Sequence, residues 1–352
     1  MLKSRLCIAF FAFAVGCAPA QKPLTDYVNP MLGTATLWDS VDLGFKPTKR
    51  TWGAEVFPGS SLPNAMVQVS PVTKFHSGAG YQYEDSVIYG FTHTNKGHWN
   101  LCHIPLLPVT GTPTPGDYCS PFSHERESAA PGYYQVFLDR YGVDAQLSST
   151  LRCAFHKYTY PAGAAASLLA DLQRSNEHVR AWDIRKEGDN VFAGWQQTGE
   201  KMYFYAVANR PVTGIEPVVE GDREVRIVRF GEGDGALELR IGFSFVSEKN
   251  ARENLEAEML GKSFAEVRSE ATATWNDLLG RIRVEGGTER EKGLFYSSLY
   301  RSFLWPALRS DVNGEFTDVD GKVINPGFRY YTGPSYWDCL LYTSPSPRDK
   351  RQ

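Results

Sequence analysis

Residues 224–260 read EVRIVRFGEGDGALELRIGFSFVSEKNARENLEAEML, and the hydrophobic period changes within this stretch. EVRIVRF and ALELRIGFSFV alternate apolar and polar side chains, which is typical of half-buried strands. The glycine-rich GEGDG that joins them predicts a β-hairpin. From Ser247 to Leu260 the apolar residues return at helical spacing instead. The stretch therefore marks the end of a β-rich part and the beginning of a helical part.

The sequence before this stretch, from about Leu24 to Ser247, consists mostly of short apolar or alternating runs. Pro, Gly and Asp residues bound these runs, as they bound strands in antiparallel sheets. Their number and spacing favour a large β-sandwich. The predicted strands are residues 64–69, 133–138, 165–170, 191–196, 203–208, 225–230 and 236–246.

The sequence after this stretch predicts two more helices. Ser263 and Glu266 form an S-x-x-E capping box at the beginning of a helix that runs to Leu279. A short strand is predicted over residues 281–285, and Thr288 then begins a second capping box with Glu291. The helix that follows is apolar on more than one face, which is typical of a helix packed on several sides. We expect it to be the first helix of a larger helical domain.

The N-terminus, MLKSRLCIAFFAFAVGCAPAQ, has the features of a secretory leader. Two basic residues precede an apolar run that is too short to span a membrane, and small residues follow. Two processing sites fit this pattern. Ala18-Pro19-Ala20 fits ordinary cleavage, which makes residues 1–20 the signal peptide, whereas Ala14 to Cys17 resembles a lipobox that would lipidate Cys17. Both predict a protein exported from a bacterium, either periplasmic or anchored in the outer membrane.

Charge and cysteine content exclude several classes of protein. The formal net charge is −3, and the leader before Cys17 and the last fourteen residues each contribute +2, which leaves −7 for residues 17–338. A mildly acidic exported protein is a poor candidate for binding nucleic acid. Outside the leader and the tail only Cys102, Cys119 and Cys153 remain. At most one disulfide can form among them, and no C-x-x-C spacing predicts a zinc site.

Seven motifs, taken in order, resemble glycoside hydrolase family 92, a family of exported bacterial exo-acting α-mannosidases. They extend from Tyr27 to Asp338, over nearly all of the mature chain. The motifs are YVNPMLGT (27–34), EVFPGSSLPNAMVQVSPVT (55–73), GYQYEDSVIYGFTHTNKGHWN (80–100), APGYYQVFL (130–138), FYSSLYRSFLWPAL (295–308), DVNGEFTDVDGKV (311–323) and YWD (336–338).

The resemblance implies a mainly β fold, in which a large N-terminal β-supersandwich is followed by a helical linker and an (α/α)6 barrel. On this basis we expect the sandwich over residues 24–262, the linker over 263–287 and the beginning of the barrel over 288–338. The missing C-terminal part of the barrel would then be the main packing partner of this chain.

The resemblance also implies chemistry, namely Ca²⁺-dependent hydrolysis of terminal α-mannosides with inversion. Inverting enzymes use a general acid and a general base roughly 6.5–9.5 Å apart. In the family this pair and most calcium ligands lie beyond the end of this chain. We therefore expect no catalytic residue and no metal ligand here, and an inactive fragment. The substrates implied are mannose-containing glycans, such as those of glycoproteins or yeast-type mannans, so the implied role is N-glycan processing and carbohydrate metabolism.

The chain departs from the family after Asp338, where it continues as CLLYTSPSPRDKRQ. Codons that spell these residues resemble a transposase sequencing adapter. We therefore expect residues 339–352 to be a processing artefact and exclude them from the fold. A genuine Ser/Pro-rich C-terminus is the alternative.

Five residues are candidates for contact with a sugar. Trp337 and Asp338 match a family Trp-Asp, in which the carboxylate accepts hydroxyl hydrogen bonds and the indole faces the sugar's C–H surface. His98, Trp99 and Asn100 replace a glycine-rich family loop expected near the mouth of the pocket. The alternatives are a helix-capping Asp beside a core Trp, and a Trp packed in the β domain. Phe57-Pro58-Gly59 is expected to shape the interface backbone instead.

Two other functions remain open on the sequence alone. A non-catalytic carbohydrate-binding surface lipoprotein would make the sandwich the whole functional unit, although the helical segment after Thr288 argues against it. A different sandwich-plus-barrel enzyme, such as a glycoside phosphorylase, would need a phosphate site. Asp311, Asn313, Asp318 and Asp320 resemble a calcium loop, but two glycine turns account for them better because the terminal Glu of an EF-hand is missing.

Overall fold

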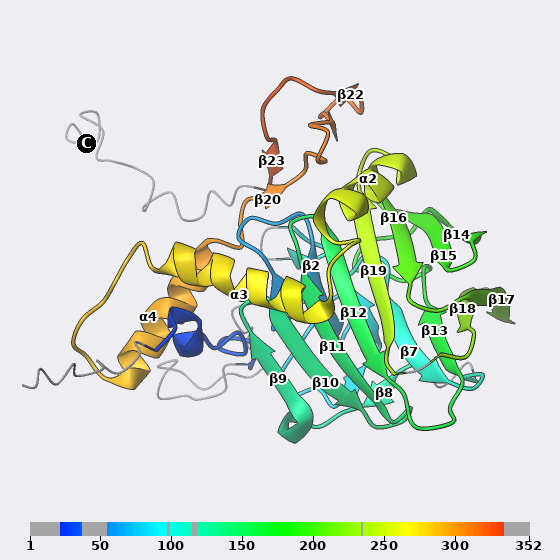
Figure 1. Cartoon of the computed structure of the whole chain (residues 1–352), viewed down its shortest axis with the longest axis horizontal. Coiled ribbons are helices and arrows are strands. Elements are labelled where there is room, and N and C mark those ends of the chain that lie inside the picture. The colour runs from blue at the N-terminus through cyan, green and yellow to red at the C-terminus, as the bar shows by residue number, and fades with distance from the viewer. Residues whose placement is uncertain (1–21, 37–54, 97–98, 115–117, 234, 334–352) are drawn as a thin grey trace, which may run out of the picture.

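The computed structural model describes residues 22–36, 55–96, 99–114, 118–233 and 235–333. Two antiparallel sheets dominate this part of the chain and pack face to face (Figure 1). One has seven strands in the order β1-β2-β4-β7-β13-β18-β17, and the other has eight in the order β14-β15-β16-β19-β12-β11-β10-β9. The chain is therefore mainly β, as the sequence predicted.

The strands of the two sheets are short to medium in length. Those of the seven-stranded sheet are β1 (Ser60–Ser61), β2 (Gln68–Val72), β4 (Gly90–Thr92), β7 (Leu106–Thr110), β13 (Ala166–Ala170), β17 (Val212–Glu220) and β18 (Arg223–Phe230). Those of the eight-stranded sheet are β9 (Glu127–Ala130), β10 (Tyr133–Leu138), β11 (Val143–Ser149), β12 (Cys153–Thr159), β14 (Ala181–Gly188), β15 (Val191–Gln197), β16 (Lys201–Ala208) and β19 (Leu237–Ser244).

Small strand pairs and helices complete the described residues. The pairs are β3 (Val87–Ile88) with β8 (Ser120–Pro121), β5 (Asn95–Lys96) with β6 (Trp99–Asn100), β20 (Ala307–Leu308) with β23 (Tyr331–Thr332), and β21 (Phe316–Thr317) with β22 (Val323–Ile324). The helices are the 3-10 turns η1 (Leu24–Tyr27) and η3 (His124–Arg126) and the α-helices α2 (Glu248–Glu258), α3 (Phe264–Leu279) and α4 (Glu289–Ser302). None of these helices is long and apolar enough to cross a membrane.

The predicted hairpin around GEGDG is wrong. β18 pairs with β13 and β17, whereas β19 pairs with β12 and β16 in the other sheet. The connection between them therefore crosses from one sheet to the other. An alternating pattern shows only that one face of each strand is buried. Two strands can each bury one face whether they pair in the same sheet or lie in two sheets that face each other. The strand predicted over residues 281–285 is also absent, because this segment forms turns and irregular structure.

Both predicted capping boxes are confirmed. Ser263 accepts from the backbone of Glu266, whose side chain accepts in return from the backbone of Ser263, and Thr288 and Glu291 repeat the arrangement at α4. Each box satisfies orphan N–H groups at the helix beginning. Both glycine turns are present as well, with Gly314 and Gly321 at positive φ.

The helices lie on one side of the sandwich. α2 packs on β16 and β19, and α3 crosses β11 and β12 (Figure 1). Trp275 of α3 is fully buried and donates from Nε1 to the carbonyl of Ser61 at 2.8 Å. It belongs to a second core with Tyr296 and Tyr300 of α4.

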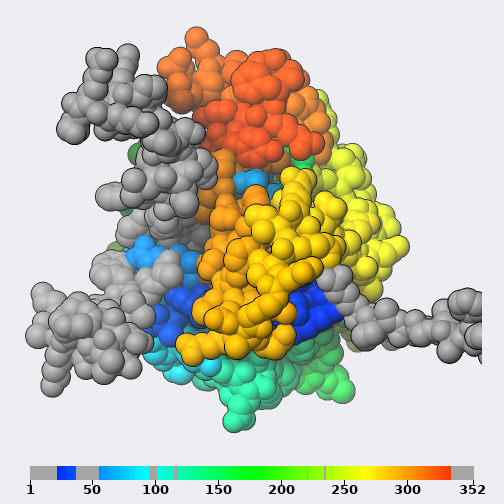
Figure 2. Space-filling view, turned by 90° about the vertical axis from the view of Figure 1, so that its left-hand side faces the viewer, coloured from blue at the N-terminus to red at the C-terminus, as the bar shows by residue number. Residues whose placement is uncertain are grey.

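The first described residues are part of the same second core. Leu24 and Val28 pack there beside α3 and α4, and the blue N-terminal segment flanks the yellow and orange helices in Figure 2. The backbone of Asn29 donates to Ser297 Oγ at 2.9 Å, and the Arg301 guanidinium donates to two carbonyls of the same segment. The N-terminal segment is thus fixed to the helical region, while Met31 also packs against the core of the sandwich.

The segment after β20 is held on the sandwich by one buried carboxylate. Asp311 accepts hydrogen bonds from Ser244 Oγ at 2.6 Å, Asn254 Nδ2 at 2.7 Å and Asn250 Nδ2 at 2.9 Å. Ser244 ends β19, and both asparagines lie on α2. Arg152 adds a bond from Nε to the carbonyl of Ser310 at 2.7 Å. Asp311 therefore joins the end of β19, helix α2 and the segment after β20.

Candidate functional site

The β5–β6 hairpin carries two of the predicted sugar-binding residues. Trp99 pairs with Lys96 across the hairpin, and Asn100 pairs with Asn95. His98, Trp337, Asp338 and the predicted lipidation residue Cys17 lie outside the described residues, as does the segment 339–352. The structure therefore places the backbone of the hairpin, and the roles of these side chains stay predictions.

A chain of hydrogen bonds fixes the base of this hairpin. The backbone of Leu101 donates to the carbonyl of Thr94 at 3.2 Å, which closes the loop. His103 Nδ1 lies 2.8 Å from Thr94 Oγ1, and His103 Nε2 lies 2.9 Å from Thr198 Oγ1. The Thr198 hydroxyl donates in turn to Glu177 Oε2 at 2.8 Å.

The direction of these bonds fixes the tautomer of the imidazole. A hydroxyl has one proton to donate, and Thr198 gives it to Glu177. Thr198 therefore accepts from His103 Nε2–H, which leaves His103 Nδ1 to accept from Thr94. His103 and Thr198 are fully buried, whereas Glu177 is half-buried and lines a surface groove. The chain thus connects the hairpin base to that groove.

A second pair of histidines lies deeper in the sandwich. His93 Nε2 and His156 Nε2 are 3.0 Å apart, and His156 Nδ1 lies 2.6 Å from the Tyr158 hydroxyl. Burial lowers the pKa of His93 to about 3, and the nearby His103 adds to the effect. Burial and His93 together lower the pKa of His156 well below its ordinary value. Both rings are therefore neutral at pH 7.

We expect this pair to make the fold acid-sensitive. Between pH 6.5 and about 3 the unfolded chain binds a proton at His93 that the folded chain does not bind. Stability therefore falls as the pH falls through this window, by up to about 1.4 kcal/mol per pH unit for each histidine. Urea unfolding at pH 7.5, 6.5, 5.5 and 4.5 measures the slope.

Substitutions separate this effect from other titrations. His156→Gln is expected to make the slope shallower by about half. His178→Gln, at an exposed histidine, is the matched control and should leave the slope unchanged. If the free energy of unfolding falls with pH equally steeply in the unsubstituted chain and in His156→Gln, other groups cause the acid sensitivity.

The strand pair β20–β23 stands beside the same end of the sandwich. Arg309 follows β20, and its guanidinium lies 3.7 Å from the centre of the Phe245 ring, with Nη2 3.2 Å from Glu200 Oε2. Burial lowers the pKa of Arg309, and the carboxylates of Glu200 and Glu177 act against this shift. β23 pairs with β20, which leads directly to Arg309. The described residues of this strand pair are thus connected, through Arg309, to Glu200 and Glu177.

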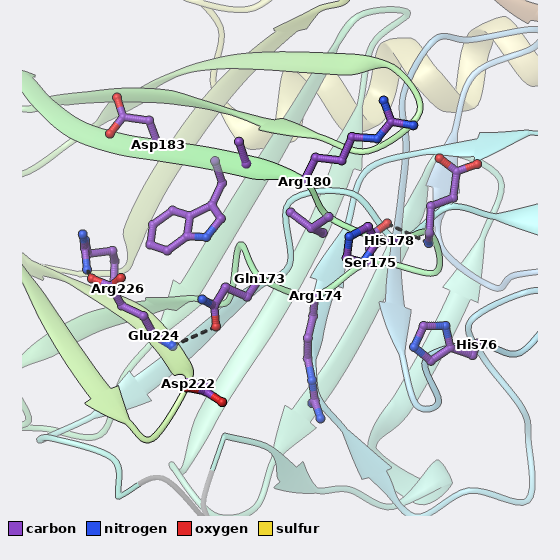
Figure 3. A pocket seen from close by; sticks show the side chains of 14 residues that line it. His76, Gln173, Arg174, Ser175, His178, Arg180, Asp183, Asp222, Glu224 and Arg226 are labelled. Carbon is purple, nitrogen blue, oxygen red and sulfur yellow. Dashed lines mark hydrogen bonds and ion pairs between the residues drawn. The ribbon is translucent and has the colours of Figure 1, made fainter.

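A groove of about 660 Å³ opens beside this site (Figure 3). Its lining comes from residues 173–183 and from the β17–β18 hairpin, with His76 at one end. No motif in the sequence pointed to this groove. Its two walls are about forty residues apart, and only the sheet topology brings them together. The sequence analysis also missed Arg309, Glu177 and Thr198.

The described cysteines and acidic residues form no further reactive centre. Cys102, Cys119 and Cys153 are thiols that form no disulfide among the described residues. Cys102 and Cys153 are buried, and burial raises the pKa of both. Among the residues that the structure describes, no group of three or more His, Cys, Asp or Glu side chains is arranged to hold a metal ion.

The chain is similar to solved mannosidases over most of its own length. The family GH92 α-mannosidase BT3965 from Bacteroides thetaiotaomicron superposes with a TM-score of 0.79 and 26% sequence identity, over 89% of this chain and 45% of that one. The same enzyme in complex with mannoimidazole gives a TM-score of 0.78. The inverting mannosidase BT2199 from the same organism is 24% identical over 92% of this chain and 46% of its own, with a TM-score of 0.75, and supports the fold alone.

A secreted glycosidase gives a similar result. An uncharacterized secreted glycosidase from Arthroderma benhamiae is 24% identical over 344 residues, which cover 82% of this chain and 42% of that protein. The chain therefore spans less than half the length of the relatives it matches.

Two family models match adjoining parts of the sequence. The glycosyl hydrolase family 92 N-terminal domain matches residues 27–254, and the family 92 catalytic domain matches residues 250–345. The first covers the two sheets described above, and the second begins at α2 and covers α3, α4 and the strands that follow. Since the matched N-terminal domain alone accounts for well over half of the residues, the chain belongs to glycosyl hydrolase family 92.

Proposed function

We propose that this chain supplies the β-sandwich and the first part of the catalytic barrel of an exo-acting α-mannosidase that removes terminal α-mannose from glycans. The observation that carries the proposal is the overlay on BT3965, a solved α-mannosidase, at 26% identity over 89% of this chain. The complex of that enzyme with mannoimidazole supports a mannose-shaped ligand for this chain as well.

The sugar contacts are proposed from the sequence and supported by the fold. Trp337 would face the sugar's C–H surface and Asp338 would accept its hydroxyl hydrogen bonds. His98, Trp99 and Asn100 would line the mouth of the pocket. The support in the described residues is that the base of the β5–β6 hairpin is tied through His103 to Thr198 and Glu177, and that Arg309, next to β20, bonds to Glu200.

The acid–base pair is proposed to lie outside this chain, in the part of the barrel that follows. An inverting reaction would place its general acid and general base roughly 6.5–9.5 Å apart, with room for the attacking water. Calcium is proposed for the whole enzyme. The described residues do not fit a calcium site, so we assign no step in this chain to the metal. This chain would bind and orient the terminal mannose.

Export is proposed on two grounds. Residues 1–20 have the composition of a leader, with Cys17 as a second processing site that would add a lipid anchor. The relative from Arthroderma benhamiae is described as secreted. A periplasmic or outer-membrane protein would meet mannose-containing glycans outside the cytoplasm.

A comparison of two proteins tests the function. The purified chain with CaCl₂ is expected to release no mannose from α-mannosides. The same chain joined after Asp338 to the second half of BT3965 is expected to release mannose, to lose activity in EGTA and to regain it with CaCl₂. Proton NMR of the first product should show β-mannose, as inversion requires.

Substitutions in the joined protein test the proposed contacts. Asp338→Asn is expected to lower kcat/KM by roughly 10- to 100-fold, because a hydrogen bond to a charged group contributes about 1.5–3 kcal/mol. Asp320→Asn, at an exposed turn, is the matched control. Release of mannose by the chain alone would contradict the proposed division of the site.

A further inference from the structure

The groove of Figure 3 lies at the open edge of the sandwich. β14 is the edge strand of the eight-stranded sheet, and β17 is the edge strand of the seven-stranded sheet. The groove runs between β14 and the β17–β18 hairpin, over the loop of residues 171–180 (Figure 3). Its volume of about 660 Å³ falls within the range of about 300–1,000 Å³ that is usual for ligand sites.

The charges in the groove almost cancel. Three arginines and four acidic residues line it, and several of them are already paired. Arg226 bonds to Glu224, and the Asp183 carboxylate lies 3.2 Å from Arg185 Nη1. A lining of this kind has no strong preference for an anion or a cation. It offers alternating donors and acceptors, which suit the hydroxyl groups of a neutral sugar.

Some of the lining side chains are free to bind a ligand. The side chains of Arg180, His178 and Asp222 make no hydrogen bond or ion pair with any residue that the structure describes, and all three residues are exposed. The backbone N–H of Arg180 donates to the carbonyl of Gln197 at 2.8 Å. In Figure 3 Arg180 and His178 belong to the segment before β14, and Asp222 belongs to the β17–β18 hairpin. Together they supply a guanidinium, an imidazole and a carboxylate at the surface.

Trp182 gives the groove an apolar wall. It lies on β14, is half-buried and has the guanidinium of Arg226 5.0 Å from its ring centre. Trp182 and Asp183 are neighbours on β14, so their side chains point to opposite faces of the sheet. A half-exposed indole beside hydrogen-bonding groups is suited to the C–H face of a pyranose.

The floor of the groove is rigid. Gln196 Nε2 donates to the carbonyls of Leu172 and Arg174, both at 2.8 Å. The side chain of Gln173 accepts from the backbone of Glu224 at 2.8 Å, which ties the floor to the β17–β18 hairpin. A preorganised site loses less conformational entropy when a ligand binds.

The groove also begins next to the candidate site. Ser175 Oγ and the backbone of Asn176 donate to the carbonyl of Leu101, at 2.6 Å and 2.8 Å, and Leu101 directly follows β6. Glu177 faces the groove and receives the hydrogen-bond chain from the hairpin base. A glycan held at the hairpin can therefore continue into the groove.

We propose that the groove between β14 and the β17–β18 hairpin binds the uncleaved part of a neutral mannose oligosaccharide, with Trp182 as the stacking wall and Arg180 and Asp222 as hydrogen-bonding groups. An exo-acting enzyme removes one residue at the chain end, so the remainder of the glycan must lie elsewhere on the protein. The identity of the sugar rests on the function proposed above, whereas the groove itself rests on the structure.

Titration of the purified chain tests the groove. The probes are an α-mannan tetrasaccharide, mannose and cellotetraose. Binding of each probe is measured by isothermal titration calorimetry in 50 mM and in 500 mM NaCl. The α-mannan tetrasaccharide is expected to bind at least tenfold more tightly than mannose or cellotetraose, with no change in salt. A strong loss of affinity in 500 mM NaCl, or equal binding of mannose, would overturn the proposal.

Variants locate the binding. Trp182→Ala is expected to weaken binding of the tetrasaccharide about tenfold, and Arg180→Ala about threefold. Trp195→Ala is the matched control, because Trp195 is half-buried on β15 but does not line the groove. Because Trp182 packs partly on the core, Arg180→Ala and Asp222→Ala test the groove at exposed positions. Unchanged binding in both of these exposed variants would overturn the proposal.

A failure of the groove proposal can be distinguished from a failure of the proposed α-mannosidase function. Mannose release by the joined protein, together with no tetrasaccharide binding by the chain, would remove the groove proposal and leave the enzyme. Tetrasaccharide binding that depends on Trp182 and Arg180, together with no mannose release, would leave the groove and remove the enzyme.

Discussion

Asp311→Ala is expected to lower the free energy of unfolding by about 3 kcal/mol or more. The change would leave Ser244 Oγ, Asn250 Nδ2 and Asn254 Nδ2 without the carboxylate that they now share. A buried donor that loses its acceptor costs roughly 1–3 kcal/mol. Because Asn250 and Asn254 lie on α2 and Ser244 ends β19, the loss would also loosen the segment after β20. Urea unfolding followed by far-UV circular dichroism measures the change.

Two further variants separate the buried network from a general loss of charge. Asp320→Ala, on the exposed turn nearby, should change stability by less than about 0.5 kcal/mol. Burial raises the pKa of Asp311, so the folded chain keeps this proton to a higher pH than the unfolded chain. The stability that comes from this bound proton is lost as the pH rises above about 4. Asp311→Asn should abolish this pH dependence of the free energy of unfolding. Equal stability of Asp311→Ala and Asp320→Ala would contradict the role of the network.

Gly59→Ala is expected to destabilise the fold by about 3 kcal/mol or more. A Cβ atom at this position would lie 2.1 Å from the carbonyl oxygen of Val69 and 2.5 Å from Cα of Ser70. Both atoms are backbone of β2, which pairs with β1 directly after Gly59. Backbone cannot move aside as the end of a flexible side chain can, so the strands must separate. Thermal and urea unfolding measure the loss.

The matched control is Gly261→Ala, because a Cβ atom there would meet nothing within 4 Å. It is expected to leave stability unchanged or to raise it slightly. A Gly59→Ala variant as stable as Gly261→Ala would show that the β1–β2 pair opens at little cost. The sequence analysis assigned Phe57-Pro58-Gly59 to shaping the interface backbone, and this stays a prediction.

Local signals in the sequence predicted the elements well. The capping boxes at Ser263 and Thr288 fixed the beginnings of α3 and α4, because these hydrogen bonds join residues three apart. Partner choice was not predictable in the same way. The strands on either side of GEGDG alternate correctly, yet each has its partners in a different sheet. Alternation specifies a buried face and contains no information on which strand lies beside it.

The candidate site shows the same limit. Residues 95–100 were marked in the sequence by their departure from a family loop, but the hairpin that they form was not predicted. Thr198 and Glu177 carry no motif, and their role depends on the position of β15 and of the loop before β14. The groove walls at Trp182 and Asp222 likewise meet only through the order of the strands. Such sites cannot be predicted from a single sequence, because they form only where residues far apart in the chain come together in the fold.

The attachment of the N-terminal segment to α4 has a consequence for biosynthesis. The bond from Asn29 to Ser297 spans 268 positions along the chain. At a translation rate of roughly 5–20 residues per second, the ribosome would need roughly 15–50 s to make the intervening residues. During that interval Leu24 and Val28 have no second core to enter. The residues around Leu24 and Val28 are therefore among the last to be placed, and they remain accessible to chaperones while the rest of the chain is synthesised.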